Sequence, residues 1–112
     1  MTPELQIRPA AQAEIDEIAD RLAQASPDIA RRFYDRIEET FARLAARPGL
    51  GEVFDVAIPA LAGLRCTSVN RFKAYLIFYL PRDGGIEVVH VRHGARDNEG
   101  LFLREDEGHD EP

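Results

Sequence analysis

The stretch Arg71-Phe-Lys-Ala-Tyr-Leu-Ile-Phe-Tyr-Leu80, followed by residues 86–93, decides the fold class of this chain. Both runs are rich in aromatic and β-branched residues, and Asp83-Gly84-Gly85 between them is a strong signal for a tight turn. The two runs therefore predict a β-hairpin of two long strands. Strand alternation puts Phe72, Ala74, Leu76, Phe78 and Leu80 on one face, and Arg71, Lys73, Tyr75, Ile77 and Tyr79 on the other.

We expect the first of these faces to lie under helices and the second to face solvent. The second strand of the hairpin is ambiguous, because Val89 and Val91 favour burial as much as Ile86 and Val88 do. We favour Val89 and Val91 inward, which turns Val88, His90 and Arg92 toward solvent. The solvent face then becomes a basic, aromatic surface suited to a partner, made of Arg65, Arg71, Lys73, Tyr75, Tyr79, His90 and Arg92.

The first half of the chain predicts a short strand and two helices. Residues 5–8 alternate as a strand does, and Pro9 suits the first turn of a helix. Apolar residues at helical spacing then continue to about residue 25. Ser26-Pro27-Asp28 restarts a helix, with Ser26 as the N-cap, and a second apolar stripe runs to about residue 47. The two helices form a hairpin whose stripes need an apolar partner.

The remaining segments complete an α+β fold. Residues 51–63 read as a loop, residues 64–69 as a strand, and residues 97–103 as a short helix. The predicted architecture is an N-terminal strand and a two-helix hairpin packed on a mostly antiparallel sheet of about four strands. We expect residues 1–104 to form a single domain and the acidic residues 105–112 to be a disordered tail.

Charge is distributed unevenly along the chain. The whole protein carries −6, yet residues 64–96 contain 6 basic and 2 acidic side chains. Local charge matters more than net charge, because salt screens interactions beyond about 8–10 Å. No apolar run is long enough to cross a membrane, no export signal is visible, and the single Cys66 fits a reducing cytoplasm. Neither a metal-ligand motif nor a glycine-rich phosphate loop is present, so we expect no metal and no cofactor.

Several short motifs occur in a fixed order: Pro48-Gly-Leu-Gly51, Leu64-Arg65, Tyr75-Leu-Ile-Phe-Tyr79 and His93-Gly-Ala-Arg-Asp97. In this order the chain resembles the ParE branch of the RelE/ParE toxin superfamily over about residues 4–103. The resemblance implies a bacterial type II toxin that arrests growth unless a cognate antitoxin covers it. ParE-like members are associated with poisoning of DNA gyrase, and RelE-like members with cleavage of messenger RNA on the ribosome.

The RelE-like alternative requires a basic cluster and a C-terminal Tyr or His, of which this chain keeps little. Arg65 stands where that pattern has its first basic residue, but Thr67 and Leu76 replace two others. His93 and Arg96 remain as a candidate acid and phosphate clamp beside Arg65. We therefore favour a non-enzymatic, gyrase-binding inhibitor with no direct nucleic-acid binding of its own. A ribonuclease, and a relic that has lost toxicity but still binds its antitoxin, stay open.

The resemblance also implies the form of the partner. The antitoxin is expected to fold a flexible C-terminal segment onto the toxin. Its apolar residues would enter the groove between the helical hairpin and the sheet, and its acidic residues would meet Arg65, Arg71 and Lys73.

Overall fold

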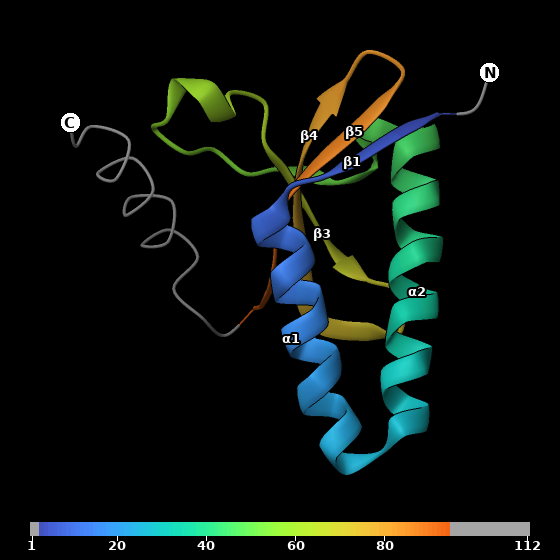
Figure 1. Cartoon of the computed structure of the whole chain (residues 1–112). Helices are drawn as coiled ribbons and strands as arrows, with labels where there is room; N and C mark the ends of the chain where they lie inside the picture. The colour runs from blue at the N-terminus through green and yellow to red at the C-terminus, as the bar shows by residue number, and fades with distance from the viewer. Residues whose placement is uncertain (1–2, 95–112) are drawn as a thin grey trace.

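The computed structural model describes residues 3–94 and confirms the α+β class (Figure 1). Its elements are β1 (Glu4–Ile7), α1 (Pro9–Ala25), α2 (Pro27–Ala46), η1 (Pro48–Leu50), β2 (Glu52–Val53), η2 (Pro59–Leu61), β3 (Arg65–Val69), β4 (Phe72–Arg82) and β5 (Gly85–His93). The predicted order of strand, helical hairpin and sheet is confirmed, and β2 is an additional short strand within the expected loop. The expected helix at 97–103, Arg96 and the tail at 105–112 lie outside the described residues.

The two helices begin where the sequence predicts. Pro9 and Pro27 each occupy the first turn, and the Ser26 hydroxyl accepts a hydrogen bond from the Ile29 N–H at 3.4 Å. Each helix buries one stripe, and the stripe of α2 includes Phe33, which is fully buried. In α2 the Thr40 hydroxyl donates to the Arg36 carbonyl and accepts from the Asn70 N–H at 3.1 Å. This hydroxyl therefore ties α2 to the turn between β3 and β4.

The sheet has the order β1-β5-β4-β3-β2, with β1 parallel to β5 and the other pairs antiparallel. The β4–β5 hairpin turns at Gly84, whose φ of +81° is one that residues with a Cβ rarely adopt. Gly85 is required for a different reason. A Cβ at this position would lie 1.8 Å from the Glu4 carbonyl oxygen, so only glycine lets β1 approach β5.

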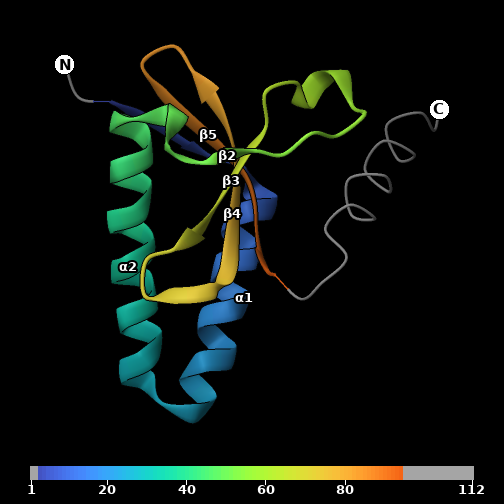
Figure 2. The same cartoon turned by 180° about the vertical axis from the view of Figure 1, so that it is seen from behind.

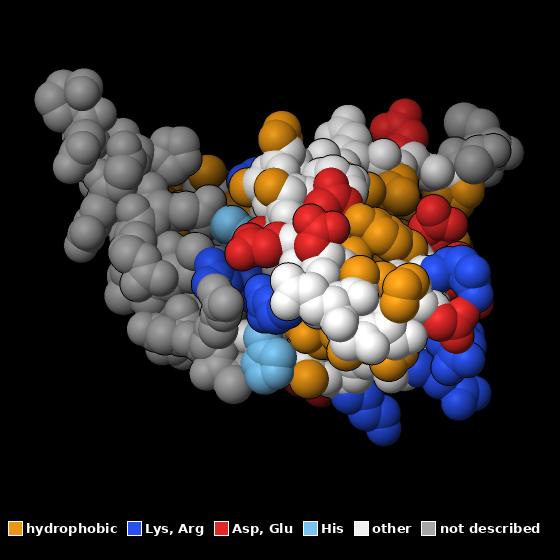
Figure 3. Space-filling view, turned by 60° about the horizontal axis from the view of Figure 1, so that its bottom comes forward, with side chains coloured by type: hydrophobic (Ala, Val, Ile, Leu, Met, Phe, Trp, Pro, Cys, Tyr) orange, Lys and Arg blue, Asp and Glu red, His pale blue; other side chains and the backbone are white. Residues whose placement is uncertain are grey.

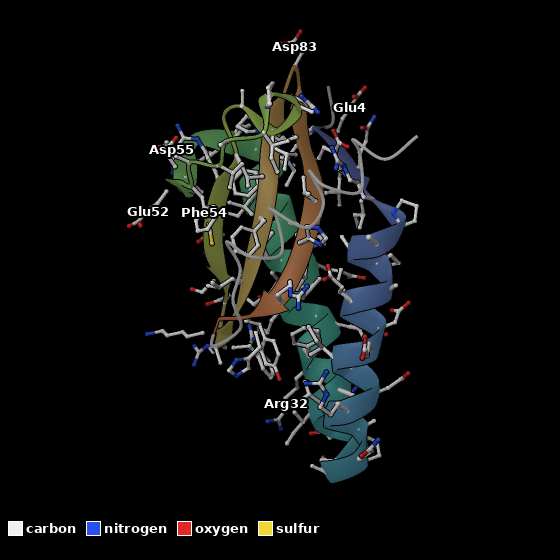
Figure 4. All side chains as sticks on the ribbon, turned by 90° about the vertical axis from the view of Figure 1, so that its left-hand side faces the viewer. Glu4, Arg32, Glu52, Phe54, Asp55 and Asp83 are labelled. Carbon is white, nitrogen blue, oxygen red and sulfur yellow. The ribbon has the colours of Figure 1, made fainter. Side chains whose placement is uncertain are left out.

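Both faces of the sheet are covered, and this overturns the predicted orientation of the central strand. The helices pack on a core that contains Ile77 and Tyr79, with Tyr75 partly buried against it. Leu76, Phe78 and Leu80 face the other way, under apolar side chains of residues 54–64. Figure 4 shows this segment and the helices on opposite sides of the strands. Phe72 does lie under the helices as expected, whereas Ala74 is exposed.

The alternation changes at irregularities in the strand pairing. Val69 pairs with Phe72 but Ser68 pairs with Leu76, so extra residues of β4 lie between Phe72 and Leu76. On β5 the partner shifts from His90 to Val88 between Phe78 and Tyr79, which leaves Val89 as an extra residue. Val88 and Val91 therefore both face the helices, and Val89 faces residues 54–64. The expected outward Val88 and helix-facing Val89 are both wrong.

Tyr79 was expected at the surface but has no exposed area. Its hydroxyl donates to the Pro48 carbonyl at 2.7 Å and accepts from the Gly51 N–H at 2.8 Å. Gly51 leaves room for this ring, because a Cβ there would lie 2.6 Å from the hydroxyl oxygen. Burial raises the pKa of Tyr79, and the hydrogen bond with Gly51 opposes that rise. One phenol thus holds the segment after α2 against the central strand.

Replacing Tyr79 with Phe should lower the free energy of unfolding by about 1–3 kcal/mol, because the Gly51 N–H and the Pro48 carbonyl lose their partner. Urea denaturation followed by circular dichroism measures this. Tyr75→Phe is the matched control and should change stability by less than about 0.5 kcal/mol, as a substitution that removes no observed hydrogen bond. Equal stability of Tyr79→Phe and the wild type would contradict the assigned role.

Candidate functional site

The turn between β3 and β4 carries the exposed part of the predicted basic surface. Arg71, at a positive φ of 67°, and Lys73 both project into solvent, as expected. They line a shallow hollow of about 290 Å³ together with the exposed Arg43 of α2. The lining is mixed, with Thr67 and Ser68 of β3 beside Leu44 and Leu50. Three cations around this hollow favour an anionic partner.

This basic hollow is lined by residues of α2 and of the turn between β3 and β4. Both opposite ribbon views place that turn beside α2 (Figures 1 and 2). In the space-filling view of the end that the helical hairpin forms, Lys and Arg side chains lie at the right and lower margins and also left of the centre (Figure 3). Beyond its two pairs with β2, β3 presents Thr67 and Ser68 at an edge that no strand within residues 3–94 covers. Cations and an open backbone edge therefore occur together here.

Arg65 is bound within the protein itself. Its Nη1 donates to the carbonyl oxygens of Gly51 at 2.6 Å and Gly49 at 3.5 Å. The guanidinium thereby holds η1 and β2 against β3. Because the side chain is partly buried and its donors face backbone carbonyls, Arg65 contributes less to an open charged surface than the sequence predicts.

Tyr75 and His93 meet at the far end of the β4–β5 pair. Their rings stack edge to face with centroids 5.3 Å apart, and Tyr75 also contacts Phe33 at 5.5 Å. Both side chains are half-buried. Tyr75 therefore lies on the helix side of the sheet and not on the opposite face, where alternation placed it.

Glu14 of α1 organises the edge of β5, although no sequence pattern singled it out. One carboxylate oxygen accepts from the Val91 N–H at 3.1 Å and lies 2.9 Å from His90 Nδ1. The other lies 3.7 Å from the Arg92 guanidinium. His90, expected in solvent, is buried, and Arg92 is half-buried. The signal in the sequence was a carboxylate on the helix that follows β1, opposite a strand carrying His90 and Arg92.

The ribonuclease alternative requires Arg65, His93 and Arg96 to act together. Arg65 pairs with Tyr79 and His93 pairs with Tyr75, four residues apart along β4, which is roughly 13 Å. The structure does not bring these two side chains together, and Arg96 lies outside the described residues. Arg65 is moreover occupied by backbone carbonyls.

Within residues 3–94, neither Cys66 nor a cluster of potential metal ligands forms a reactive site. Burial, with a smaller effect of Glu52, raises the pKa of the half-buried Cys66 thiol to about 11, so the thiol stays protonated at neutral pH. Among residues 3–94, no group of three or more His, Cys, Asp or Glu side chains is placed to hold a metal ion. No helix in the same range is long and apolar enough to cross a membrane.

An apolar groove of about 460 Å³ opens on the opposite flank of α2 from the basic hollow. It lies between β1 and the two helices. The exposed Leu5 and Tyr34 stand at its margin, and the buried Ile15, Ile37 and Phe41 line it more deeply. This is the hairpin–sheet groove that was expected to receive the apolar residues of an antitoxin.

Comparison with known proteins assigns the family. No curated protein matches the chain. Among solved structures, a chain of the "Chromosomal ParDE TA system from P. aeruginosa" is similar, with a TM-score of 0.64 and 18% identity. The match covers 82% of this chain and 96% of that chain, and at this identity it shows a shared fold. The family described as "ParE toxin of type II toxin-antitoxin system, parDE" matches residues 5–98, and the chain therefore belongs to this family of type II toxins.

Proposed function

We propose that this protein arrests bacterial growth in the cytoplasm by binding DNA gyrase, and that a cognate antitoxin neutralises it. Membership of the ParE toxin family is the observation that carries the proposal. The placement of the candidate ribonuclease residues supports it, because Arg65 and His93 lie apart and Arg65 is engaged in structural hydrogen bonds. A mode of action by binding therefore fits these residues better than RNA cleavage.

The antitoxin is proposed to engage both flanks of α2. Its acidic residues would meet Arg43, Arg71 and Lys73 in the basic hollow, and its apolar residues would enter the groove beside β1. Exposed ion pairs contribute at most about 1 kcal/mol each, so the apolar contacts must supply most of the affinity. The cations mainly accelerate and orient the encounter.

Purified protein at micromolar concentration should inhibit supercoiling of relaxed plasmid by DNA gyrase, because the toxin is proposed to bind the enzyme directly. Agarose gels of plasmid topology measure the effect. Toxin incubated first with its antitoxin is the control and should leave supercoiling intact. Unchanged supercoiling by the free toxin would contradict the proposal, and messenger-RNA cuts on translating ribosomes would point to the ribonuclease alternative instead.

Arg71→Glu should slow association with the antitoxin roughly three- to tenfold at low salt, while dissociation changes little, because an exposed charge acts mainly through steering. Stopped-flow kinetics at two salt concentrations measure both rates. Arg31→Glu, an exposed substitution on α2 outside the hollow, should leave association nearly unchanged. An association rate that is independent of salt and of Arg71 would refute a binding role for the basic hollow.

A further inference from the structure

The basic hollow has no counter-charge within the described chain. Arg43, Arg71 and Lys73 are exposed, and no Asp or Glu side chain lines the hollow with them. Within residues 3–94, none of these three cations forms an ion pair with a carboxylate, whereas three other arginines of α2 do. Like charges held close together repel each other, so an anionic group placed among them is favoured.

Other places where cations gather are already balanced by acids. The cavity at the end of β5 is lined by Arg21 and Arg92, but Glu14 and Glu17 line it as well. Near the β4–β5 turn, Arg82 pairs with Glu87 at 2.6 Å. Of these three features of residues 3–94, the basic hollow alone carries uncompensated positive charge.

The last described residue lies beside this hollow. The Gly94 N–H donates to the Ala74 carbonyl at 2.7 Å, and Ala74 directly follows Lys73 in β4. Residues 95–112 therefore begin next to one of the three cations. Residues 105–112 contain five acidic side chains and no Lys or Arg. Glu105 follows Gly94 by eleven residues, which can span up to about 36 Å, so the acidic segment can reach the whole hollow.

The covalent connection favours this segment over other anionic occupants. Exposed ion pairs are individually weak, so an acidic peptide free in dilute solution would occupy the hollow only slightly. A group joined to its site by a short linker has an effective concentration on the order of millimolar. Residues 105–112 therefore have an advantage over a second copy of the chain and over a dilute anionic partner. A partner that also makes apolar contacts can still displace them.

We propose that the acidic residues 105–112 bind the basic hollow of their own chain and screen its charge. Their carboxylates meet Arg43, Arg71 and Lys73, and the contact forms and breaks rapidly because only exposed ion pairs hold it. The contact itself does not depend on the proposed function. Its consequence does: the screened hollow attracts the acidic residues of the antitoxin more slowly.

Paramagnetic relaxation in NMR spectra of the full chain tests the contact. A nitroxide label is attached through Gly108→Cys, with Cys66→Ser so that one thiol remains. At low salt, the amide signals of Arg71 and Lys73 should broaden at least about twofold more with the native tail than with a neutral tail of the same length. The neutral tail carries Glu105→Gln, Asp106→Asn, Glu107→Gln, Asp110→Asn and Glu111→Gln.

The neutral tail separates attraction by charge from mere proximity along the chain. The difference between the two tails should disappear in about 1 M salt, where the Debye length is about 3 Å. Equal broadening by both tails at low salt would overturn the inference, and so would broadening centred on the cavity at the end of β5. Broadening of an unlabelled copy mixed with a labelled one would show a contact between two molecules and would also overturn it.

A pair of charge reversals locates the contact. Arg71→Glu should reduce the broadening at Lys73 at least about twofold, because the hollow loses one cation and gains an acid. Arg31→Glu is the matched control on α2 outside the hollow and should leave the broadening unchanged. Equal effects of the two substitutions would overturn the assignment of the tail to this hollow.

Stopped-flow kinetics with the antitoxin measure the consequence. The neutral tail should speed association about two- to fivefold at low salt and have no effect in about 1 M salt. Equal association rates for the two tails would overturn the screening role. If the protein forms no complex with the antitoxin, the proposed neutralisation is refuted, whereas the broadening of the Arg71 and Lys73 signals still decides the contact.

Discussion

Burial of β4 on both faces is the constraint on which the rest of this structure depends. From Ile77 to Leu80 four successive side chains are buried, two toward the helices and two toward residues 54–64. The extra residue at Val89 allows β5 to follow the same division, because Val88 and Val91 can then both face the helices. The Tyr79 hydroxyl completes the arrangement by fastening the segment after α2 to the strand. Within residues 3–94, the stretch of residues 77–80 in β4 therefore has no free face for a ligand.

Polar groups near the centre of the sheet therefore serve the fold, and accessible groups lie at the edges. Glu14 accepts a hydrogen bond from the Val91 N–H of β5, beyond the end of β1. Arg65 donates to the Gly51 carbonyl next to β2. Two open features flank α2: a basic hollow beside the edge of β3 and an apolar groove beside the edge of β1. The two flanks differ in polarity, so a partner that wraps α2 can bind in one orientation only. This asymmetry gives specificity to contacts that are individually weak.

The sequence predicted the elements well and the faces poorly, for physical reasons. Proline and serine at helix starts and Gly84 in the hairpin act locally, so Pro9, Ser26 and Gly84 were sufficient to place these elements. The orientation of the strand side chains was inferred from alternation, which assumes that one face of the sheet is exposed to solvent. In this structure, residues 54–64 cover that second face. The extra residue at Val89 also breaks the alternation along β5, so Val88 and Val91 face the same side. Arg71 and Lys73 were placed correctly because they lie at a turn, whereas Glu14 was missed because its partners are distant in sequence.

Hydroxyl-radical footprinting of the native protein tests the two-sided burial of β4 most directly. This method reports the solvent access of individual side chains and does not depend on their pKa. The account predicts rapid oxidation of Tyr34, which is 37% exposed, and protection of Phe78 and Tyr79 until the protein is unfolded in urea. Oxidation of Tyr79 in the native protein at the rate of Tyr34 would contradict it, because the central strand would then present an open face.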